Sequence, residues 1–291
     1  MSQTKVTRSN PACIMLLVDK SGSMAEKLTF NEQLMTKSQA VSIIINSFID
    51  ELLYRCRKGG SYMNYFEVAL LGYSDNKTYS MLESLDSDRI TFTVPDLTNA
   101  NVDKYSISKR RIGSDGLYYT HTTTINKWID HTDGGNTPMK QALLELYKHA
   151  NQWIQKNKDR YTIPPILIHI SDGEATDSET PTLLKIADKI KSLSIGGGKV
   201  TFMNVNISSM HKESIIFPSS SLELPKENTT AKLLYDMSST LSKEYAESIS
   251  YIKDKELSTF DASIPVKAMA YNASLNELIG ILSIGTSTIS G

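Results

Sequence analysis

The chain has 291 residues, which is enough for one large α/β domain or for one domain with an appendage. Its formal net charge is −1, with both signs spread along the sequence, which argues against nucleic acid or an anionic membrane surface as a partner. The two cysteines and five scattered histidines form neither a zinc-binding spacing nor a disulfide framework.

The expected location is the cytoplasm. Residues 1–10 lack the apolar stretch of a signal peptide, and no segment approaches the length needed to cross a bilayer. Cys13 lies in an apolar run and Cys56 near the end of a predicted helix, so both are interpreted as packing residues in a reducing compartment.

The first predicted element is a strand at residues 13–18, apolar at every position as in a parallel sheet buried on both faces. The spacing of apolar residues predicts a helix at 34–56. A second strand is predicted at 66–73, with weaker strands near 79–82 and 90–94. Residues 95–136 are expected to form a long irregular connection, and connections of this length are usually functional or mobile.

Strands and helices continue to alternate along the rest of the chain. The predicted strands are 166–170, 200–207, 215–217 and 266–271, and the predicted helices are 139–153, 183–193, 229–251 and 274–282, the second closed by the glycines at 196–198. The alternation predicts a doubly wound, mostly parallel α/β sheet flanked by helices. The expected organisation is a flexible N-terminus at 1–10 and a single domain at 11–291, with an irregular insertion at about 95–136 and a C-terminal strand–helix extension at about 255–285.

A carboxylate and two hydroxyls follow the first buried strand, in the motif Asp19-Lys20-Ser21-Gly22-Ser23. Ligands of doubly wound folds bind beyond the carboxyl ends of the strands, so these side chains lie where a site is expected. The motif alone is weak, because Asp236-Met237-Ser238-Ser239-Thr240 nearly repeats it inside a predicted helix.

Two further segments lie at the ends of predicted elements. Gly134-Gly135-Asn136-Thr137-Pro138 opens a helix, and Ile170-Ser171-Asp172-Gly173-Glu174 closes a buried strand. Each has a local alternative: Thr137 as an N-cap before a proline, Asp172-Gly173 as a turn, and Ser21-Gly22-Ser23 as a cap of the first helix. Their order and their shared position at element ends favour one metal site.

An Asp-x-Ser-x-Ser motif, then a threonine, then an Asp-Gly after a buried strand resembles the metal-ion-dependent adhesion site of von Willebrand factor A (vWA) domains. The resemblance runs from about residue 12 to 250, and the tail at 268–275 and 282–286 is similar to bacterial stand-alone members associated with tellurite resistance. It implies a Rossmann-like vWA fold and five metal ligands, namely Asp19, Ser21, Ser23, Thr137 and Asp172. It also implies a stress-response or phospho-signalling assembly, with a protein kinase or a PP2C-like phosphatase as a partner.

The chemistry of these residues agrees with that implication. Oxygen-only ligands select a hard cation, which favours Mg²⁺, with Mn²⁺ or Ca²⁺ as alternatives. The three hydroxyls are expected to be direct ligands, while Asp19 and Asp172 act mostly through waters. Neutral direct ligands leave the ion electrophilic, so one coordination position suits an Asp or Glu side chain of a protein partner.

Three functions compete for such a site. The favoured one is a metal-dependent protein-interaction module that has no catalytic residues and is not an enzyme. The alternative is a Mg²⁺-dependent hydrolase or phosphotransferase on the same fold, although the sequence offers no nucleophile–base pair and no nucleotide loop. Gly196-Gly197-Gly198-Lys199 follows a helix and precedes a strand, the reverse of a phosphate-binding loop. A scaffold without metal is the third.

The partner surface is expected in the connection before Thr137. Tyr118, Tyr119 and Trp128 offer large contact area, and Arg110 and Arg111, beside Lys109, could steer an acidic partner. The alternative is that the aromatic side chains pack the connection onto the domain.

Overall fold

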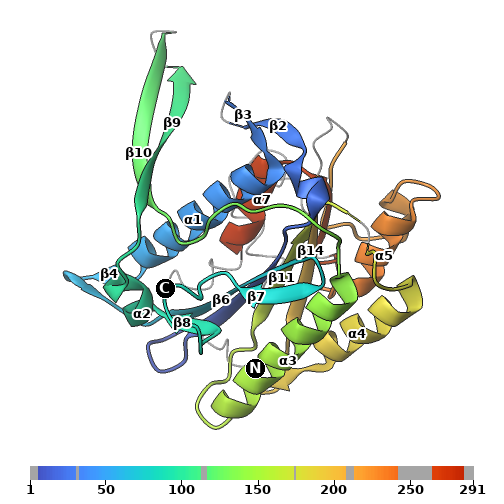
Figure 1. Ribbon diagram of the computed structural model, residues 1–291. Coiled ribbons are helices and arrows are strands. Elements are labelled where there is room, and N and C mark those ends of the chain that lie inside the picture. The colour runs from blue at the N-terminus through green and yellow to red at the C-terminus, as the bar shows by residue number, and fades with distance from the viewer. Residues whose placement is uncertain are drawn as a thin grey trace.

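The computed structural model describes residues 6–30, 33–112, 117–173, 175–207, 213–241 and 264–284. Its central sheet is built from β1 (Ala12–Asp19), β6 (Phe66–Ser74), β7 (Lys77–Ser80), β8 (Thr91–Thr93), β11 (Ile166–Ser171), β14 (Thr201–Ile207), β15 (Ile215–Ile216) and β16 (Met269–Ala273). The strand order is β15-β16-β14-β11-β1-β6-β7, with β8 also paired to β6 (Figure 1). The inner strands β16, β14, β11, β1 and β6 run parallel, while β15, β7 and β8 pair antiparallel at the edges.

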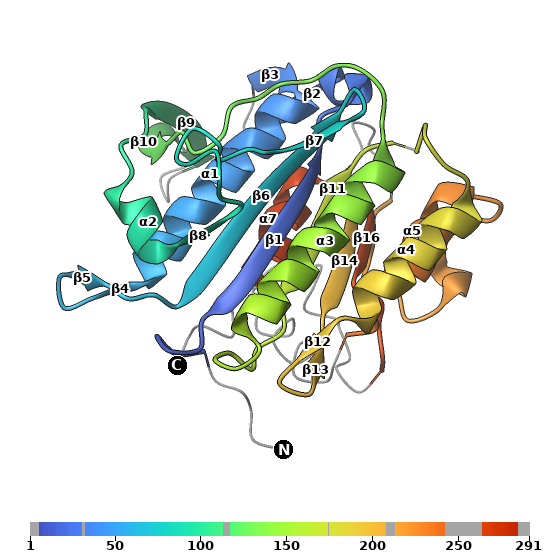
Figure 2. The same cartoon turned by 60° about the horizontal axis from the view of Figure 1, so that its bottom comes forward.

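Helices cover both faces of this sheet (Figure 2). They are α1 (Lys37–Arg55), α2 (Val94–Asn99), α3 (Met139–Asn157), α4 (Thr180–Ser192), α5 (Thr229–Met237) and α7 (Leu275–Ile284), with the 3₁₀ turns η1 (Gly22–Ala25) and η2 (Ser221–Glu223). Side chains of β1 alternate between two cores: Ile14, Leu16 and Val18 pack with α1 and α7, and Cys13, Met15 and Leu17 pack with α3 and α4. The predicted doubly wound, mostly parallel α/β fold is confirmed.

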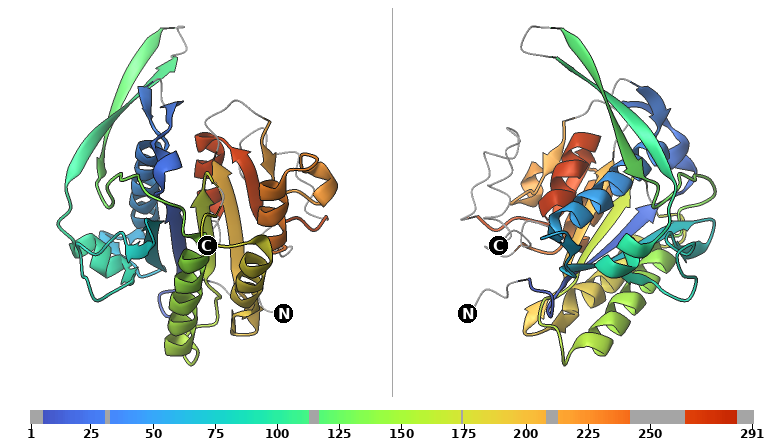
Figure 3. Two further views of the ribbon diagram at one scale, coloured as in Figure 1. Left: turned by 45° about the vertical axis from the view of Figure 1, so that its right-hand side comes forward. Right: turned by 90° about the vertical axis from the view of Figure 1, so that its left-hand side faces the viewer.

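Four two-stranded hairpins lie outside the central sheet within the described ranges. They are β2 (Lys27–Phe30) with β3 (Gln33–Thr36), β4 (Arg57–Lys58) with β5 (Ser61–Tyr62), β9 (Lys104–Ile112) with β10 (Tyr118–Asn126), and β12 (Ser194–Ile195) with β13 (Gly198–Lys199). The β9–β10 hairpin projects from the α1 side of the body, toward the same end of the molecule as β2–β3 (Figures 1 and 3). The segment predicted to be irregular at 95–136 therefore contains a short helix and a long regular hairpin, and that part of the prediction is wrong.

Two helix ends differ from their predictions. The helix α4 ends at Ser192, and Gly196 and Gly197 adopt φ angles of 59° and 83° in the turn of the β12–β13 hairpin, so these glycines do not cap the helix. The helix α5 ends at Met237, and Thr240 forms a bridge to Lys267, so the helix predicted through 251 is too long; residues 242–251 lie outside the described residues.

Contacts near the two chain ends bear on the predicted organisation. Asn10, within the predicted flexible N-terminus, exchanges two hydrogen bonds with Thr162, at 2.9 and 3.0 Å, and the flexibility of residues 1–10 stays a prediction. Residues 1–5 lie outside the described residues. The strand β16 pairs with β14, so the predicted C-terminal extension completes the central sheet. Residues 255–263 and 285–286 are also outside the described part.

Two cysteines, Cys13 and Cys56, are free and buried, as the sequence predicts for packing residues. Among the described residues, no helix is both long and apolar enough to cross a bilayer.

Candidate metal centre

The centre of the candidate site is Asp19, the last residue of β1. Parallel register places Asp19 beside Tyr73 of β6, and Val18 beside Ile170, so Ser171 of β11 reaches the same level. Oδ2 of Asp19 accepts hydrogen bonds from Ser171 Oγ at 2.9 Å and Tyr73 OH at 3.2 Å, and Oδ1 accepts one from the Ser21 amide at 2.8 Å. The carboxylate is therefore fixed at the carboxyl edge of three strands.

In the part of the chain that the structure describes, no cationic side chain directly contacts the Asp19 carboxylate. Its hydrogen bonds come from neutral donors, and burial raises the pKa of the carboxyl above its ordinary range, with the hydrogen bonds only partly offsetting this. Behind it, Tyr73 OH contacts His169 Nε2 at 2.8 Å, and burial lowers the pKa of His169 to about 4, so this imidazole is neutral at physiological pH. A cation in front of Asp19 would stabilise the ionised carboxylate.

Three further predicted residues are joined to Asp19 by short contacts. Ser21 Oγ lies 3.2 Å from Ser23 Oγ, and Ser23 Oγ donates to Asp172 Oδ1 at 2.7 Å. Asp19 and Ser21 are buried, whereas Ser23 is exposed, so the cluster opens to solvent on the Ser23 side.

Hydrogen bonds of Thr137 and of the loop that precedes it hold this residue near the cluster. Its amide donates to Thr176 Oγ1 at 3.0 Å and its carbonyl accepts from the Thr176 amide at 3.0 Å, which ties it to the loop after β11. The preceding loop is tied to the loop after β1, because Gly22 N donates to Gly135 O and Gly134 N donates to Lys20 O, both at 3.0 Å. The segments carrying all five predicted residues therefore meet at one edge of the sheet.

Gly135 permits this close approach. Its φ of 72° lies in the left-handed region, and a Cβ there would come within 2.7 Å of the Cβ of Asp75. A side chain at this position would separate the loop from the strand ends that it bridges.

The helix-capping alternatives for Ser21 and Thr137 are wrong. Thr36 caps α1, in a capping box with Gln39. The helix α3 begins at Met139, and its first free amides, those of Lys140 and Gln141, donate to the Asp177 carboxylate at 2.9 and 3.1 Å. The hydroxyls of Ser21 and Thr137 are thus not needed to cap α1 or α3.

The donor set fits a small hard cation. Mg²⁺ binds oxygen at about 2.0–2.1 Å in an octahedron, so adjacent ligand oxygens lie about 3 Å apart. The Ser21–Ser23 separation of 3.2 Å matches such an edge. Within the described residues, no group of three or more His, Cys, Asp or Glu side chains is arranged to hold a metal, so an ion here would rely on the hydroxyl oxygens.

Lys37, which no sequence motif indicates, contacts the Asp172 carboxylate of this site. Its ammonium lies 2.7 Å from Asp172 Oδ2 and 2.7 Å from Glu26 Oε2, and its side chain is 5% exposed. Burial opposes the charge on Lys37, but hydrogen bonds to Asp172 and Glu26 outweigh burial, so its pKa is raised. No motif points to this pair, because the two residues are 135 positions apart.

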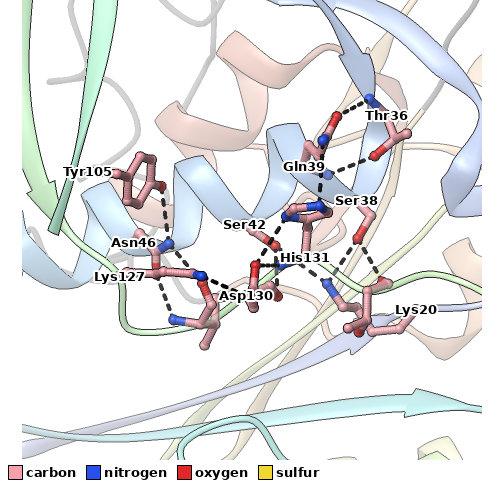
Figure 4. A network of polar contacts seen from close by, with 12 residues as sticks. Lys20, Thr36, Ser38, Gln39, Ser42, Asn46, Tyr105, Lys127, Asp130 and His131 are labelled. Atoms are coloured by element: carbon pink, nitrogen blue, oxygen red, sulfur yellow. Dashed lines mark hydrogen bonds and ion pairs between the residues drawn. The ribbon is translucent and has the colours of Figure 1, made fainter. Parts of the chain in front are cut away.

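The side chain of a second lysine, Lys20, extends toward Ser38 and Ser42 of α1 (Figure 4). Its ammonium donates to Ser38 Oγ at 3.1 Å and Ser42 Oγ at 3.4 Å. Burial lowers the pKa of Lys20 to about 8, although Asp133, Asp130 and Asp19 attract its charge. The charged ammonium is therefore less favourable in the folded chain than in water.

We expect Lys20→Met to raise the free energy of unfolding at pH 7, in EDTA, by about 1–3 kcal/mol. Both serines keep their own donor bonds to main-chain carbonyls. Because the pKa of Lys20 is about 8 in the folded chain and 10.5 for an ordinary lysine in water, the unfolded chain binds more protons between these values. The free-energy cost of burying the charged Lys20 ammonium is fully present below pH 8 and fades toward pH 10.5. The stability gained by Lys20→Met, measured by urea denaturation, should therefore shrink from pH 7 to pH 9.5. A gain that grows with pH would contradict this assignment.

The segment after β10 contacts a row of polar residues on α1, at intervals of four positions. These residues are Ser38, Ser42 and Asn46, which Figure 4 shows, and Asp50. Asn46 exchanges hydrogen bonds with the Ile129 main chain at 2.9 and 3.0 Å. Asp50 accepts from Trp128 Nε1 at 2.8 Å. The four-residue period of polar side chains was the available sequence signal for this attachment.

The predicted partner surface is only partly exposed. Trp128 is 4% exposed and belongs to the core cluster around α1, so its assignment to a binding face is wrong and the packing alternative holds for it. Tyr118 and Tyr119 lie on β10 with exposed fractions of 61% and 53%. Arg110 and Arg111 lie on β9, opposite Thr120 and Tyr119.

The sequence matches no protein-family model and no curated protein. Solved structures that resemble this chain include the following three. A von Willebrand factor type A protein from Catenulispora acidiphila has a TM-score of 0.38 and 11% identity, over 68% of this chain and 34% of that one. Three N-terminal domains of the type V pili tip protein Mfa5 from Porphyromonas gingivalis have a TM-score of 0.28 and 17% identity, over 57% and 20%. An uncharacterized membrane-spanning protein from Vibrio fischeri has a TM-score of 0.25 and 19% identity, over 66% and 90%.

The chain thus spans about a third of the length of the first of these proteins and a fifth of the second. At these TM-scores and identities the likenesses carry no weight in assigning a site. The candidate site rests on the residues of this chain, where Asp19, Ser21, Ser23 and Asp172 form one continuous set of contacts beside Thr137.

Proposed function

We propose that this chain is a divalent-metal-dependent protein-interaction module. In this proposal Mg²⁺ is held by Asp19, Ser21, Ser23, Thr137 and Asp172, and an Asp or Glu side chain of a protein partner completes its coordination. The observation that supports it most is the Ser21–Ser23–Asp172 contact series at the carboxyl edge of the sheet, with hydroxyls spaced as neighbouring ligands of an octahedral ion.

The exposure of the cluster supports a binding role. Ser23 and its neighbours Gly22, Gly135 and Asn136 are exposed, whereas Asp19 is buried behind them. An ion in this position has protein on one side and solvent on the other, which leaves room for a ligand from a partner. We propose that the ion serves binding and not turnover.

The resemblance to vWA domains adds candidates for the partner. It makes a protein kinase or a PP2C-like phosphatase of a bacterial stress-response assembly, such as one for tellurite resistance, the first proteins to test. Mn²⁺ or Ca²⁺ could take the place of Mg²⁺, because both accept the same oxygen donors.

The experiment is an affinity capture from lysate with immobilised wild-type chain and Asp19→Ala, each in Mg²⁺ and in EDTA, read by quantitative mass spectrometry. The proposal expects proteins that are retained by wild type in Mg²⁺, released by EDTA and missing from the Asp19→Ala sample. A parallel screen on phosphate esters covers the alternative. Mg²⁺-dependent hydrolysis that is lost in Ser21→Ala would replace the binding function with a catalytic one.

We propose that the β9–β10 hairpin contacts the same partner. Residues 118–124 of β10 are all exposed, so both faces of this strand are open, and Lys104, Lys109, Arg110 and Arg111 make β9 basic. A two-stranded ribbon adds little to domain stability where its side chains are exposed, as those of residues 118–124 are. Its charge suits an acidic partner.

We therefore expect deletion of residues 106–124, with Tyr105 joined to Ile125 through Asn-Gly, to change the free energy of unfolding by less than about 1 kcal/mol. Tyr105 and Ile125 face each other at the base of the hairpin, so the join keeps the register. Magnesium affinity should be unchanged, and partner capture should fall about tenfold or more. Undiminished capture by the deletion variant would remove the hairpin from the interface.

A further inference from the structure

The Lys37 ammonium pairs with one carboxylate oxygen of Asp172, a residue that the proposed function assigns to the metal. Asp172 Oδ1 accepts from Ser23, and Asp172 Oδ2 contacts Lys37 at 2.7 Å. The Asp172 side chain is fully buried, so both of its oxygens are committed to these partners and not to bulk water. Lys37 therefore neutralises one of the two carboxylates on which a divalent ion would depend.

Glu26 is a second carboxylate partner of the Lys37 ammonium. The β2–β3 hairpin joins η1 to α1, and at its base Lys37 N donates to Glu26 O at 2.9 Å, which keeps the two residues together. Glu26 Oε2 lies 2.7 Å from the Lys37 ammonium, and its side chain is 58% exposed, against full burial for Asp172. A small movement of the lysine side chain toward Glu26 would release Asp172 without leaving the ammonium unpaired.

We propose that Lys37 is a tethered cation that competes with the divalent metal for Asp172, and that metal binding moves Lys37 onto Glu26. The inference rests on the proposed metal site and adds a residue that sets its affinity. Two positive charges close to one carboxylate repel each other strongly where solvent screening is weak. Lys37 therefore weakens metal binding by the chain alone, and a partner carboxylate that adds a ligand strengthens it.

A purely structural lysine predicts the opposite effect. If Lys37 served only to orient Asp172 toward Ser23, removing the ammonium would loosen the ligand and weaken metal binding. The sign of the change in affinity therefore separates competition from support.

The test is calorimetric titration with Mg²⁺ of wild type, Lys37→Met, Lys37→Arg and Glu26→Gln, with the melting temperature in EDTA measured alongside. Competition predicts that Kd falls about tenfold or more in Lys37→Met, because the opposing charge is gone. Lys37→Arg keeps the charge and should stay within about threefold of wild type. Glu26→Gln removes the second carboxylate that pairs with the Lys37 ammonium, so the Kd for Mg²⁺ should rise. This variant tests the competition even if Lys37→Met does not fold.

Each outcome of this titration either supports or overturns the proposed competition between Lys37 and the metal. An unchanged or higher Kd in Lys37→Met overturns the competition, while wild-type binding that is lost in Asp19→Ala leaves the proposed function standing. If wild type does not bind Mg²⁺ but Lys37→Met does, the lysine holds the place of the metal and the proposed function fails for the natural chain. If neither binds, both proposals fail.

Discussion

Replacing Trp128 with alanine is expected to lower the free energy of unfolding by about 3–5 kcal/mol, the usual cost of removing a buried tryptophan. The side chain is 4% exposed, packs in the core cluster around α1 and donates to Asp50 Oδ1 at 2.8 Å. Its loss leaves a cavity beneath the segment that leads to Thr137. Urea denaturation at pH 7 in EDTA measures the change without a contribution from metal.

Tyr119→Ala is the matched control, because Tyr119 lies in the same part of the chain but is 53% exposed. Its effect should stay within about 0.5 kcal/mol. A Trp128→Ala variant that loses less than about 1 kcal/mol would show that the side chain is not part of the core, and would return it to the candidate binding face.

Asp19→Ala is expected to abolish the stabilisation that Mg²⁺ gives to the wild-type chain. At a free Mg²⁺ concentration of about 100 Kd, binding to the folded state alone adds about 2.7 kcal/mol, or roughly 5 °C in melting temperature. The variant lacks the carboxylate that accepts from Ser21, Ser171 and Tyr73, so the hydroxyl ligands lose their anchor. Differential scanning calorimetry in Mg²⁺ and in EDTA measures both shifts.

Asp177→Ala separates loss of metal from loss of a nearby carboxylate. Asp177 caps α3 through Lys140 N and Gln141 N and lies outside the five-residue set. Its removal should cost about 1 kcal/mol and leave the Mg²⁺-induced shift intact. Equal shifts in wild type and Asp19→Ala would remove Asp19 from the site.

Much of the sheet could be predicted from sequence, because its inner strands are buried on both faces. In β1 and β11 every residue is buried, and such strands read as continuous apolar runs. The β9–β10 hairpin could not be predicted in this way. Residues 118–124 are exposed on both faces, so the polar run Thr120-His121-Thr122-Thr123-Thr124 shows no alternation between a core side and a solvent side.

The residues of the candidate site also divide into those that the sequence predicts and those that it does not. The five motif positions lie at strand and helix ends, so parallel topology alone predicts that Asp19 and Asp172 share one edge of the sheet. Lys37 and Tyr73 could not be found from local pattern, because their contacts with these carboxylates depend on the β2–β3 hairpin and on the register of β6. Trp128 was misplaced because an aromatic residue in a long connection looks the same in sequence whether it faces a partner or the core.

The most direct test of the metal site is a crystal structure of the chain grown with Mn²⁺, which takes the same ligands as Mg²⁺ and is located by its anomalous scattering. We expect one strong peak bonded to the hydroxyl oxygens of Ser21, Ser23 and Thr137, with Asp19 and Asp172 close behind. A map without a peak there, in which Ser23 Oγ still donates to Asp172 Oδ1, would contradict the proposed metal site.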